Sequence, residues 1–414
     1  MFENVLEEPV AVERLRRDPF RTHLEAVARA LLDLGYAEST VRCYRWCLTD
    51  FSRWVVRRGV VVGDLDDGVI DAFLAERKRQ GRLHRSHRPA VRSLLGQLRE
   101  QGLVATPEQG GEQSPAVELV GRYEEYLRVE RGLAPATLVC YRPLVRCFVN
   151  ECLSDQPVGP WELEPKGISS FIVRHAHSMH PARAKLMVTT LRSFLRFLFQ
   201  RGQIEANLAQ AVPTVAGWQQ STIPKHLSPE DVGRLLDACD RSTSAGRRDR
   251  AILLLLARLG LRAGEVVALR LDEIDWRAGK IVVRGKGLLR DYLPLLPEVG
   301  EALVTYLRED RPHLPTRRVF VRMRAPLRGF AGPSTVSTIV RRALQRAGLN
   351  PPVMGAHLLR HSLATGMLRC GASIAEIGEV LRHRCPSTTE IYAKVDSAGL
   401  RSLAQPWPVA GGGP

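Results

Sequence analysis

Six side chains that can bind, protonate or attack a phosphodiester follow one another in the second half of this 414-residue chain. They are Arg262, Lys286, His357, Arg360, His383 and Tyr392. Guanidinium groups pair with phosphate oxygens, histidine and lysine can transfer protons, and a tyrosine phenol can form a covalent bond to phosphorus. Their order predicts that Tyr392 cleaves a phosphodiester through a covalent intermediate.

The reaction itself suggests a task for each side chain. Attack on the phosphate adds negative charge to the nonbridging oxygens, which Arg262, Arg360 and His383 can neutralise. A phenol with a pKa of about 10 is a poor nucleophile at neutral pH, so a base is needed, and His357 is the expected base. The oxygen that departs from phosphorus needs a proton. We expect Lys286 to supply it.

The elements around Arg262 and Lys286 can be predicted from apolar runs and glycines. The run 251–256 indicates a buried helix ending at Gly260, which places Arg262 in the turn before the next helix. Glu265 lies three residues later and is expected to hold the guanidinium in place. Two β-rich runs, 280–284 and 291–295, predict a hairpin whose loop carries Lys286, and 319–321 is expected to form a third strand.

The other candidates are expected on helices near the C-terminus. His357 and Arg360 are three residues apart on a predicted helix and can face the same phosphate. His361 could point there too, but a structural hydrogen bond in the core is the favoured interpretation. His383 is expected to follow a helix over 374–382. A capping box over 387–390 then predicts a new helix with Tyr392 in its second turn.

These residues occur in five short strings, Gly260-Leu261-Arg262-Ala263-Gly264-Glu265, Gly285-Lys286-Gly287, His357-Leu358-Leu359-Arg360-His361, Leu381-Arg382-His383 and Thr388-Thr389-Glu390-Ile391-Tyr392. Together the strings resemble the active-site signature of the tyrosine recombinases, the phage-integrase family, strongly over 222–396 and more weakly back to 114.

The resemblance implies a site-specific recombinase or integrase that cuts and rejoins double-stranded DNA through a 3′-phosphotyrosyl link and a Holliday junction. It also implies a homotetramer on specific DNA sites, without metal or nucleotide cofactors, and transposon-like elements that encode sister recombinases. Two other functions stay open: a type IB-like topoisomerase, and a sequence-specific DNA-binding protein with an inactive site.

Composition independently favours nucleic acid as the partner. The formal net charge is +16, from 60 Lys and Arg against 44 Asp and Glu, and only seven of the 60 are lysine. The stretches 77–99 and 311–346 carry eight and nine basic residues without an acidic one, although a solvated basic face is the alternative for either. No apolar run approaches the roughly 20 residues of a membrane-spanning helix. We expect a cytoplasmic, nucleoid-associated bacterial protein.

The eight cysteines show no paired spacing typical of a zinc site, so reduced and mostly buried thiols are expected. Cys43 and Cys47 lie one helical turn apart and could form half of a metal site, but no second pair follows. His175, His177 and His180 also cluster, and a polar or DNA-facing loop is the favoured interpretation. No metal site is predicted.

An internal repeat divides the first half of the chain. Gly35, Thr40, Cys43, Tyr44 and Phe51 match Gly132, Thr137, Cys140, Tyr141 and Phe148 at an offset of 97, and later matches drift to 100. Linker-like stretches lie near 105–114 and 213–224. We therefore predict a mainly α protein with three domains. These are an N-terminal helical module over 1–105 that duplicates the next domain, a core-binding domain over 114–212 and a catalytic domain with a small antiparallel sheet over 222–405.

Overall fold

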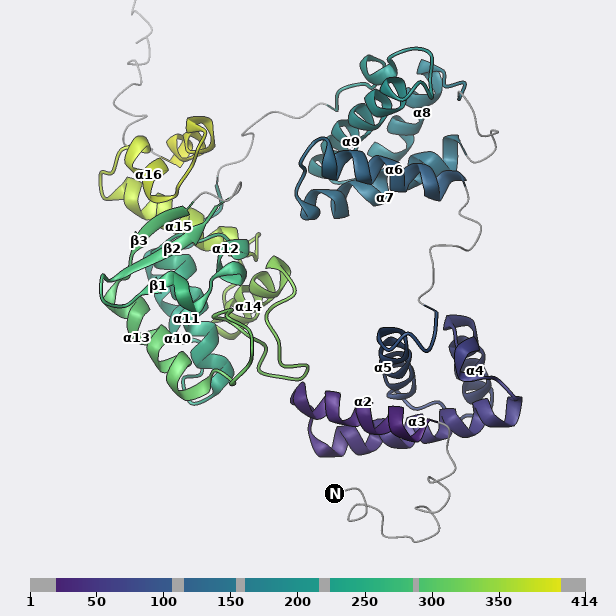
Figure 1. The fold of residues 1–414 in the computed structure, drawn as a ribbon. Coiled ribbons are helices and arrows are strands. Elements are labelled where there is room, and N and C mark those ends of the chain that lie inside the picture. The colour runs from purple at the N-terminus through teal and green to yellow at the C-terminus, as the bar shows by residue number, and fades with distance from the viewer. Residues whose placement is uncertain (1–19, 106–114, 154–160, 216–223, 286–289, 396–414) are drawn as a thin grey trace, which may run out of the picture. The chain divides into compact units, whose positions relative to one another are not determined.

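The computed structural model describes residues 20–105, 115–153, 161–215, 224–285 and 290–395 (Figure 1). The described residues are mainly helical, with one sheet of three short antiparallel strands. The predicted fold class is confirmed. The helices form three sets, each with a hydrophobic core of its own, and each set is described separately below.

The first two sets contain the same four-helix arrangement. The N-terminal set comprises α2 (Arg21–Asp33), α3 (Glu38–Arg58), α4 (Asp67–Arg79) and α5 (His87–Glu100), and the second comprises α6 (Pro115–Val129), α7 (Pro135–Cys152), α8 (Pro165–Ala176) and α9 (Pro181–Gln200). In each set the last helix packs on the other three, and the first packs on the second. The internal repeat of the sequence therefore coincides with a repeated packing pattern.

One aromatic pair recurs at the centre of both cores. The rings of Phe51 and Phe73 pack edge to face with centroids 5.1 Å apart, and so do the rings of Phe148 and Phe171, again at 5.1 Å. All four rings are at most 1% exposed. Edge-to-face pairs of this kind add to the stabilisation from apolar burial, so Phe51 and Phe148, which match in the repeat, occupy equivalent positions in the two cores.

The third set of helices surrounds α11 (Ser244–Arg258). The side chains at 251–256 are fully buried, as the apolar run predicted. Around α11 pack the helices α10 (Pro229–Asp237), α12 (Ala263–Ala268), α13 (Pro297–Thr305), α14 (Pro333–Arg346) and α15 (Ala356–Arg369). Ser228 begins α10, because its Oγ accepts the N–H of Asp231 at 3.1 Å. After α15 come α16 (Ile374–Val380) and two 3₁₀ helices, Pro386–Thr388 and Glu390–Val395.

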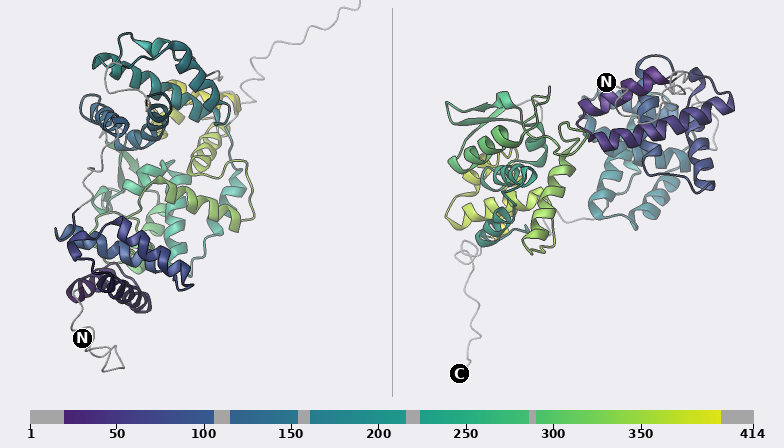
Figure 2. Two further views of the ribbon diagram at one scale, coloured as in Figure 1. Left: turned by 90° about the vertical axis from the view of Figure 1, so that its right-hand side faces the viewer. Right: turned by 90° about the horizontal axis from the view of Figure 1, so that it is seen from below.

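The sheet has the order β1-β2-β3, with β1 at Ile274–Asp275, β2 at Lys280–Arg284 and β3 at Arg290–Pro294. The right panel of Figure 2 shows the β2–β3 hairpin at the outer edge of this set. The prediction of a third strand at 319–321 is wrong. Residues 274–275 already pair with β2 on the side away from β3, and Val321 forms only an isolated bridge to Gly329. Its buried position reflects core packing, which a short β-branched run cannot distinguish from strand pairing.

No helix among the described residues is long and apolar enough to cross a membrane.

Candidate active site

Arg262 is held by a carboxylate, as its sequence context predicted. It is the residue before α12, and its Nη1 donates to Oε1 of Glu265 at 2.7 Å while its backbone N–H donates to Oε2 at 2.9 Å. Arg382 also donates to Oε2, at 2.9 Å. Burial raises the pKa of Glu265, but the Arg262 N–H and the two guanidinium charges outweigh it and leave the pKa below its ordinary value. Glu265 is therefore a charged anchor for both arginines.

Arg360 occupies the centre of the site and is only 3% exposed. It donates from Nη1 to the carbonyl of Gly260 and from Nη2 to the carbonyl of Leu381, which joins the end of α11 to the end of α16. Burial, followed by the charges of Arg262 and Arg382, lowers its pKa to about 10. Arg360 therefore stays protonated at neutral pH and carries a positive charge among the candidate residues.

His357 lies three residues before Arg360 on α15, as predicted, with its side chain exposed. Partial burial lowers the pKa of its imidazole, and the charges of Arg360 and Arg262 lower it further. A neutral imidazole at physiological pH can accept a proton. The structure thus places His357 near Arg360 and Arg262, with its side chain exposed to solvent.

Tyr392 is the most enclosed of the candidates, at 1% exposure. Its hydroxyl lies 2.8 Å from Nδ1 of His361. Burial raises the pKa of Tyr392 to about 12 although the charge of Arg360 opposes the shift. Burial, His357 and Arg360 lower the pKa of His361 to about 4. Both shifts favour the neutral pair, so the phenol keeps its proton in this structure.

The favoured interpretation of His361, a structural hydrogen bond in the core, agrees with the structure, because its Nδ1 lies 2.8 Å from the hydroxyl of the buried Tyr392. The sequence did not indicate that this partner would be the candidate nucleophile. The four-residue spacing from His357 did indicate the correct face of α15. It could not indicate that the segment around Tyr392 returns to that face.

The segment that carries His383 and Tyr392 differs from the prediction. The helix α16 ends at Val380 rather than 382, because Arg382 adopts a left-handed conformation at φ 56° that ends the helical turn. The predicted capping box over 387–390 is absent, and Tyr392 lies in a 3₁₀ helix. Thr389, a member of that predicted box, instead places Oγ1 2.7 Å from Nδ1 of His383.

That contact holds one nitrogen of the His383 ring. Burial lowers the pKa of His383 to about 4, with Arg360 and Arg262 contributing further. Nδ1 is engaged by Thr389, whereas Nε2 makes no hydrogen bond to any described residue. Five of the six candidates, Arg262, His357, Arg360, His383 and Tyr392, therefore gather in one region, while Lys286 lies outside the described residues.

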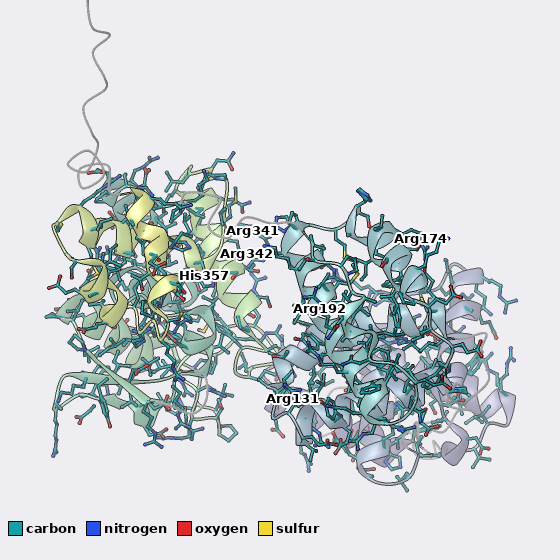
Figure 3. The ribbon with its side chains drawn as sticks, turned by 90° about the horizontal axis from the view of Figure 1, so that it is seen from above. Arg131, Arg174, Arg192, Arg341, Arg342 and His357 are labelled. Carbon is teal, nitrogen blue, oxygen red and sulfur yellow. The ribbon has the colours of Figure 1, made fainter. Side chains whose placement is uncertain are left out.

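A basic helix adjoins this region. Arg341 and Arg342 on α14 are exposed, and α14 packs against α15, which carries His357 (Figure 3). Within the described part of the chain neither arginine forms an ion pair. Two unpaired guanidinium groups beside the candidate site suit contacts to flanking phosphates.

Comparison with known proteins agrees with this geometry. Residues 225–398 match the model of the phage integrase family, and 120–202 match that of the phage integrase N-terminal SAM-like domain. The putative integrase/recombinase y4rA of Sinorhizobium fredii is 43% identical over 399 residues, which cover 96% of this chain and 97% of y4rA. The chain belongs to the phage integrase family. It is a tyrosine recombinase, an enzyme that cleaves and rejoins DNA.

Two further relatives extend the comparison. Tyrosine recombinase XerD of Lacticaseibacillus casei is 32% identical over 290 residues, covering 68% of this recombinase and 95% of XerD. The structure of a lambda integrase tetramer bound to a Holliday junction aligns with a TM-score of 0.52 at 20% identity, over 75% of this chain and 88% of that one. At that identity the alignment supports the fold alone, and it agrees with the helical sets described above.

Proposed function

We propose that this recombinase acts on specific DNA sites by attack of Tyr392 on a phosphodiester. The phenol loses its proton to a base, its oxygen forms a bond to phosphorus, and the bond to the 5′ oxygen breaks. The product is a 3′-phosphotyrosyl link, which a 5′-hydroxyl from a second duplex displaces to form a Holliday junction. The observation that carries this proposal is the Tyr392 hydroxyl, 2.8 Å from a neutral imidazole and within the field of Arg360.

The base in this proposal is His361 rather than His357. The sequence favoured His357, but His361 is the imidazole in hydrogen-bonding distance of the phenol. His357 is then free, with Arg262 and Arg360, to bind the nonbridging oxygens. His383 contributes Nε2 to the same oxygens. Stabilisation of the charge that develops there is usually the largest contribution to such a reaction.

Lys286 remains the proposed acid for the departing 5′ oxygen. It belongs to the segment between β2 and β3. These two strands pair along their whole length, from Lys280 opposite Pro294 to Arg284 opposite Arg290. A lysine ammonium can donate a proton, whereas the arginines hold theirs too tightly. No metal or nucleotide has a task in these steps.

The proposed partner is double-stranded DNA with defined recombination sites, bound by a homotetramer or together with sister recombinases. The tetrameric arrangement of lambda integrase on a Holliday junction supports this assembly. We further propose that 114–212 and 222–405 act as core-binding and catalytic domains, that 1–105 is a duplicated module, and that the protein works on the nucleoid in the cytoplasm, in integration or transposition.

The decisive experiment traps the covalent intermediate. The full-length protein is mixed with a nicked duplex that contains the recombination site from the DNA flanking its gene. Wild type should give a protein–DNA adduct that survives denaturation, and Tyr392→Phe should bind the same DNA without any adduct. An adduct of equal yield in Tyr392→Phe would remove Tyr392 as the nucleophile. Relaxation of any supercoiled plasmid by a monomer, without strand exchange, would instead favour the topoisomerase alternative.

A further inference from the structure

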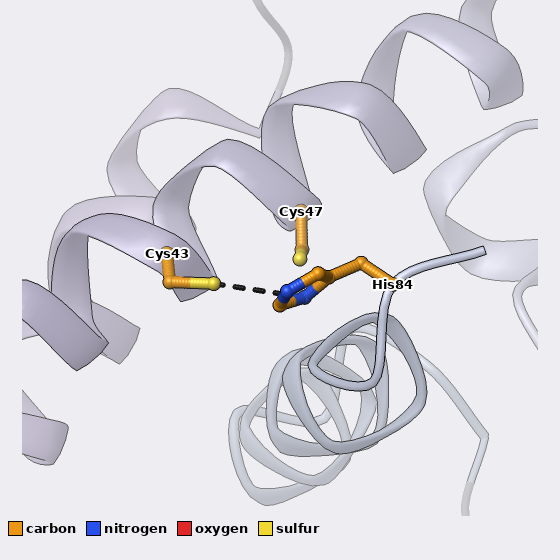
Figure 4. Close-up of side chains that lie close together, drawn as sticks. All are labelled: Cys43, Cys47 and His84. Carbon is orange, nitrogen blue, oxygen red and sulfur yellow. Dashed lines mark hydrogen bonds between the residues drawn. The ribbon is translucent and has the colours of Figure 1, made fainter. Parts of the chain in front are cut away.

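We propose that Cys43, Cys47 and His84 of the N-terminal helices form a binding site for one zinc ion. The two cysteines lie one turn apart on α3, and His84 comes from the loop between α4 and α5, with its ring directed at the sulfur atoms (Figure 4). One ligand atom from each residue lies within 4.8 Å of the other two. This site is separate from the recombination chemistry.

The distances agree with those of a tetrahedral zinc site. Zn–S and Zn–N bonds of about 2.3 and 2.0–2.1 Å place neighbouring ligand atoms roughly 3.6–3.8 Å apart. The Sγ of Cys43 lies 3.8 Å from Nδ1 of His84. Zinc binding would therefore need only small side-chain movements, and the 3.2 Å hydrogen bond from the N–H of Ser86 to Nδ1 of His84 would have to break.

The loop is held in place independently of any metal. The ring of His87 is fully buried, and its Nδ1 accepts the backbone N–H of His84 at 2.8 Å. The exposed ring of Trp46 packs edge-on against His84 at 6.2 Å between centroids. The imidazole is thus presented to α3 by neighbours that are not themselves ligands.

The burial of the three ligands suits a zinc ion with one open position. Cys47 is fully buried, Cys43 is half-buried and His84 is exposed. Cysteine binds zinc as the thiolate, so the ion must displace the proton of each thiol. The exposed side, next to His84, leaves the fourth position to water or an external ligand.

The internal repeat supplies a comparison within the same chain. At the offset of 97, Cys43 corresponds to Cys140, but Cys47 corresponds to Leu144, which is 4% exposed in the second core. The second set of helices therefore folds without this pair of ligands. A leucine at position 47 should likewise be compatible with the N-terminal core.

A second group with metal-ligand chemistry has a different explanation. In the second set, Cys147, Glu151 and His175 also come within ligand distance of one another. There Glu151 is already engaged by His175 at 2.7 Å and by Arg174. These partners balance the charge of the Glu151 carboxylate, so this group does not need a metal cation.

The zinc ion would connect α3 to the loop that carries part of the basic stretch 77–99. Arg82 and Arg85 are exposed in that loop on either side of His84. Fixing the loop reduces the entropy cost when these side chains meet a phosphate backbone. This consequence rests on the proposed DNA-binding role of the module, whereas metal binding does not.

The test measures metal directly in the full-length reduced protein. We expect about one zinc ion per chain by elemental analysis, and Co²⁺ in its place should give an intense thiolate-to-cobalt charge-transfer band. Cys47→Leu and His84→Gln should each weaken Co²⁺ binding on the order of 100-fold, as expected when one of three protein ligands is removed. Cys140→Ser should leave the band unchanged, because Cys140 is the exposed counterpart of Cys43 in the repeat.

Circular dichroism of each variant establishes that it is folded, and His84→Gln serves as the second ligand variant because His84 is exposed. Absence of the thiolate band in wild type, or an equal band in Cys47→Leu and His84→Gln, would overturn the site. The Tyr392 adduct is measured in the same preparations. A protein that forms the adduct but binds no metal refutes the zinc site alone, and one that binds metal without an adduct refutes the proposed function alone.

Discussion

Single residues of the site could be predicted where a short sequence separation sets the geometry. The three-residue spacing of Arg262 and Glu265 led to the observed ion pair, and that of His357 and Arg360 led to their shared helix. Contacts between distant segments could not be predicted. Arg382 lies more than a hundred residues after Glu265 in the sequence, yet it binds the same carboxylate as Arg262. No local sequence pattern indicates that ion pair.

The contact between His361 and Tyr392 leads to a prediction about the base. His361→Gln should slow adduct formation by about 10²–10⁴-fold, the usual contribution of a general base, while DNA binding is retained. His357→Gln should instead weaken binding of the phosphate with a smaller effect on the cleavage step. Single-turnover cleavage on a nicked substrate measures both effects.

The low pKa of His361 gives that prediction a pH signature. An imidazole whose pKa is lowered to about 4 is neutral, and able to accept a proton, at every pH above that value. Wild-type cleavage should therefore lose this base only well below the ordinary histidine pKa of 6.5. In His361→Gln the rate should rise with pH. A wild-type rate that falls at pH 6.5, or an unchanged profile in His361→Gln, would return the task to His357.

The proposed acid can be tested by changing the leaving group. Lys286→Ala should cut ordinary DNA far more slowly, yet recover on a substrate whose 5′-bridging oxygen is replaced by sulfur, because a thiolate leaves without a proton. Arg360→Ala is the matched comparison, since it is proposed to bind nonbridging oxygens that the sulfur does not alter. Equal rescue of both variants would assign the proton to another residue.

At the scale of elements, long periodic segments were predictable and short ones were not. The helices α10, α11 and α15 follow from capping residues and apolar spacing, and the β2–β3 hairpin from two β-rich runs around glycines. The errors fall on segments of three to seven residues. Tertiary contacts decide those segments, as when Thr389 bonds to His383 rather than capping a helix.

Gly260 illustrates how one residue sets the junction of two elements. Its φ is +60°, and a Cβ there would lie 2.8 Å from Cδ2 of Leu381. Gly260→Ala should lower the free energy of unfolding by about 1–3 kcal/mol through backbone strain and this clash. It should also reduce cleavage, because the Gly260 carbonyl accepts from Arg360.

The control for that substitution is Gly121→Ala on α6. A methyl group at Gly121 would have no neighbouring atom within 4 Å, and the residue has no positive φ. Alanine should therefore be neutral or stabilising there by up to about 1 kcal/mol. Denaturant unfolding monitored by circular dichroism compares the two. A similar small effect at both positions would show that the α11–α16 junction tolerates movement.

At the scale of the whole molecule, the repeat was visible in the sequence because matched residues occupy equivalent places in two sets of helices. Phe51 and Phe148 each meet a second phenylalanine from the third helix of their set. The surfaces of the two sets are less constrained than their cores. Their sequences diverge there, so equal packing does not establish equal function.

The duplicated front of the chain yields the last prediction. If the module over 1–105 binds DNA, removal of residues 1–110 should shorten the DNA segment that the protein protects from nuclease and should weaken DNA binding. The slope of log K against log salt should become less negative by about 0.9 for each phosphate that the protein no longer neutralises. Arg82→Gln with Arg85→Gln in the full-length protein is the finer probe, because both side chains are exposed and their replacement should reduce the slope without removing the core. A footprint and slope unchanged by the deletion, together with an altered oligomeric state, would make the module an assembly domain, and its basic stretch would then be a solvated face.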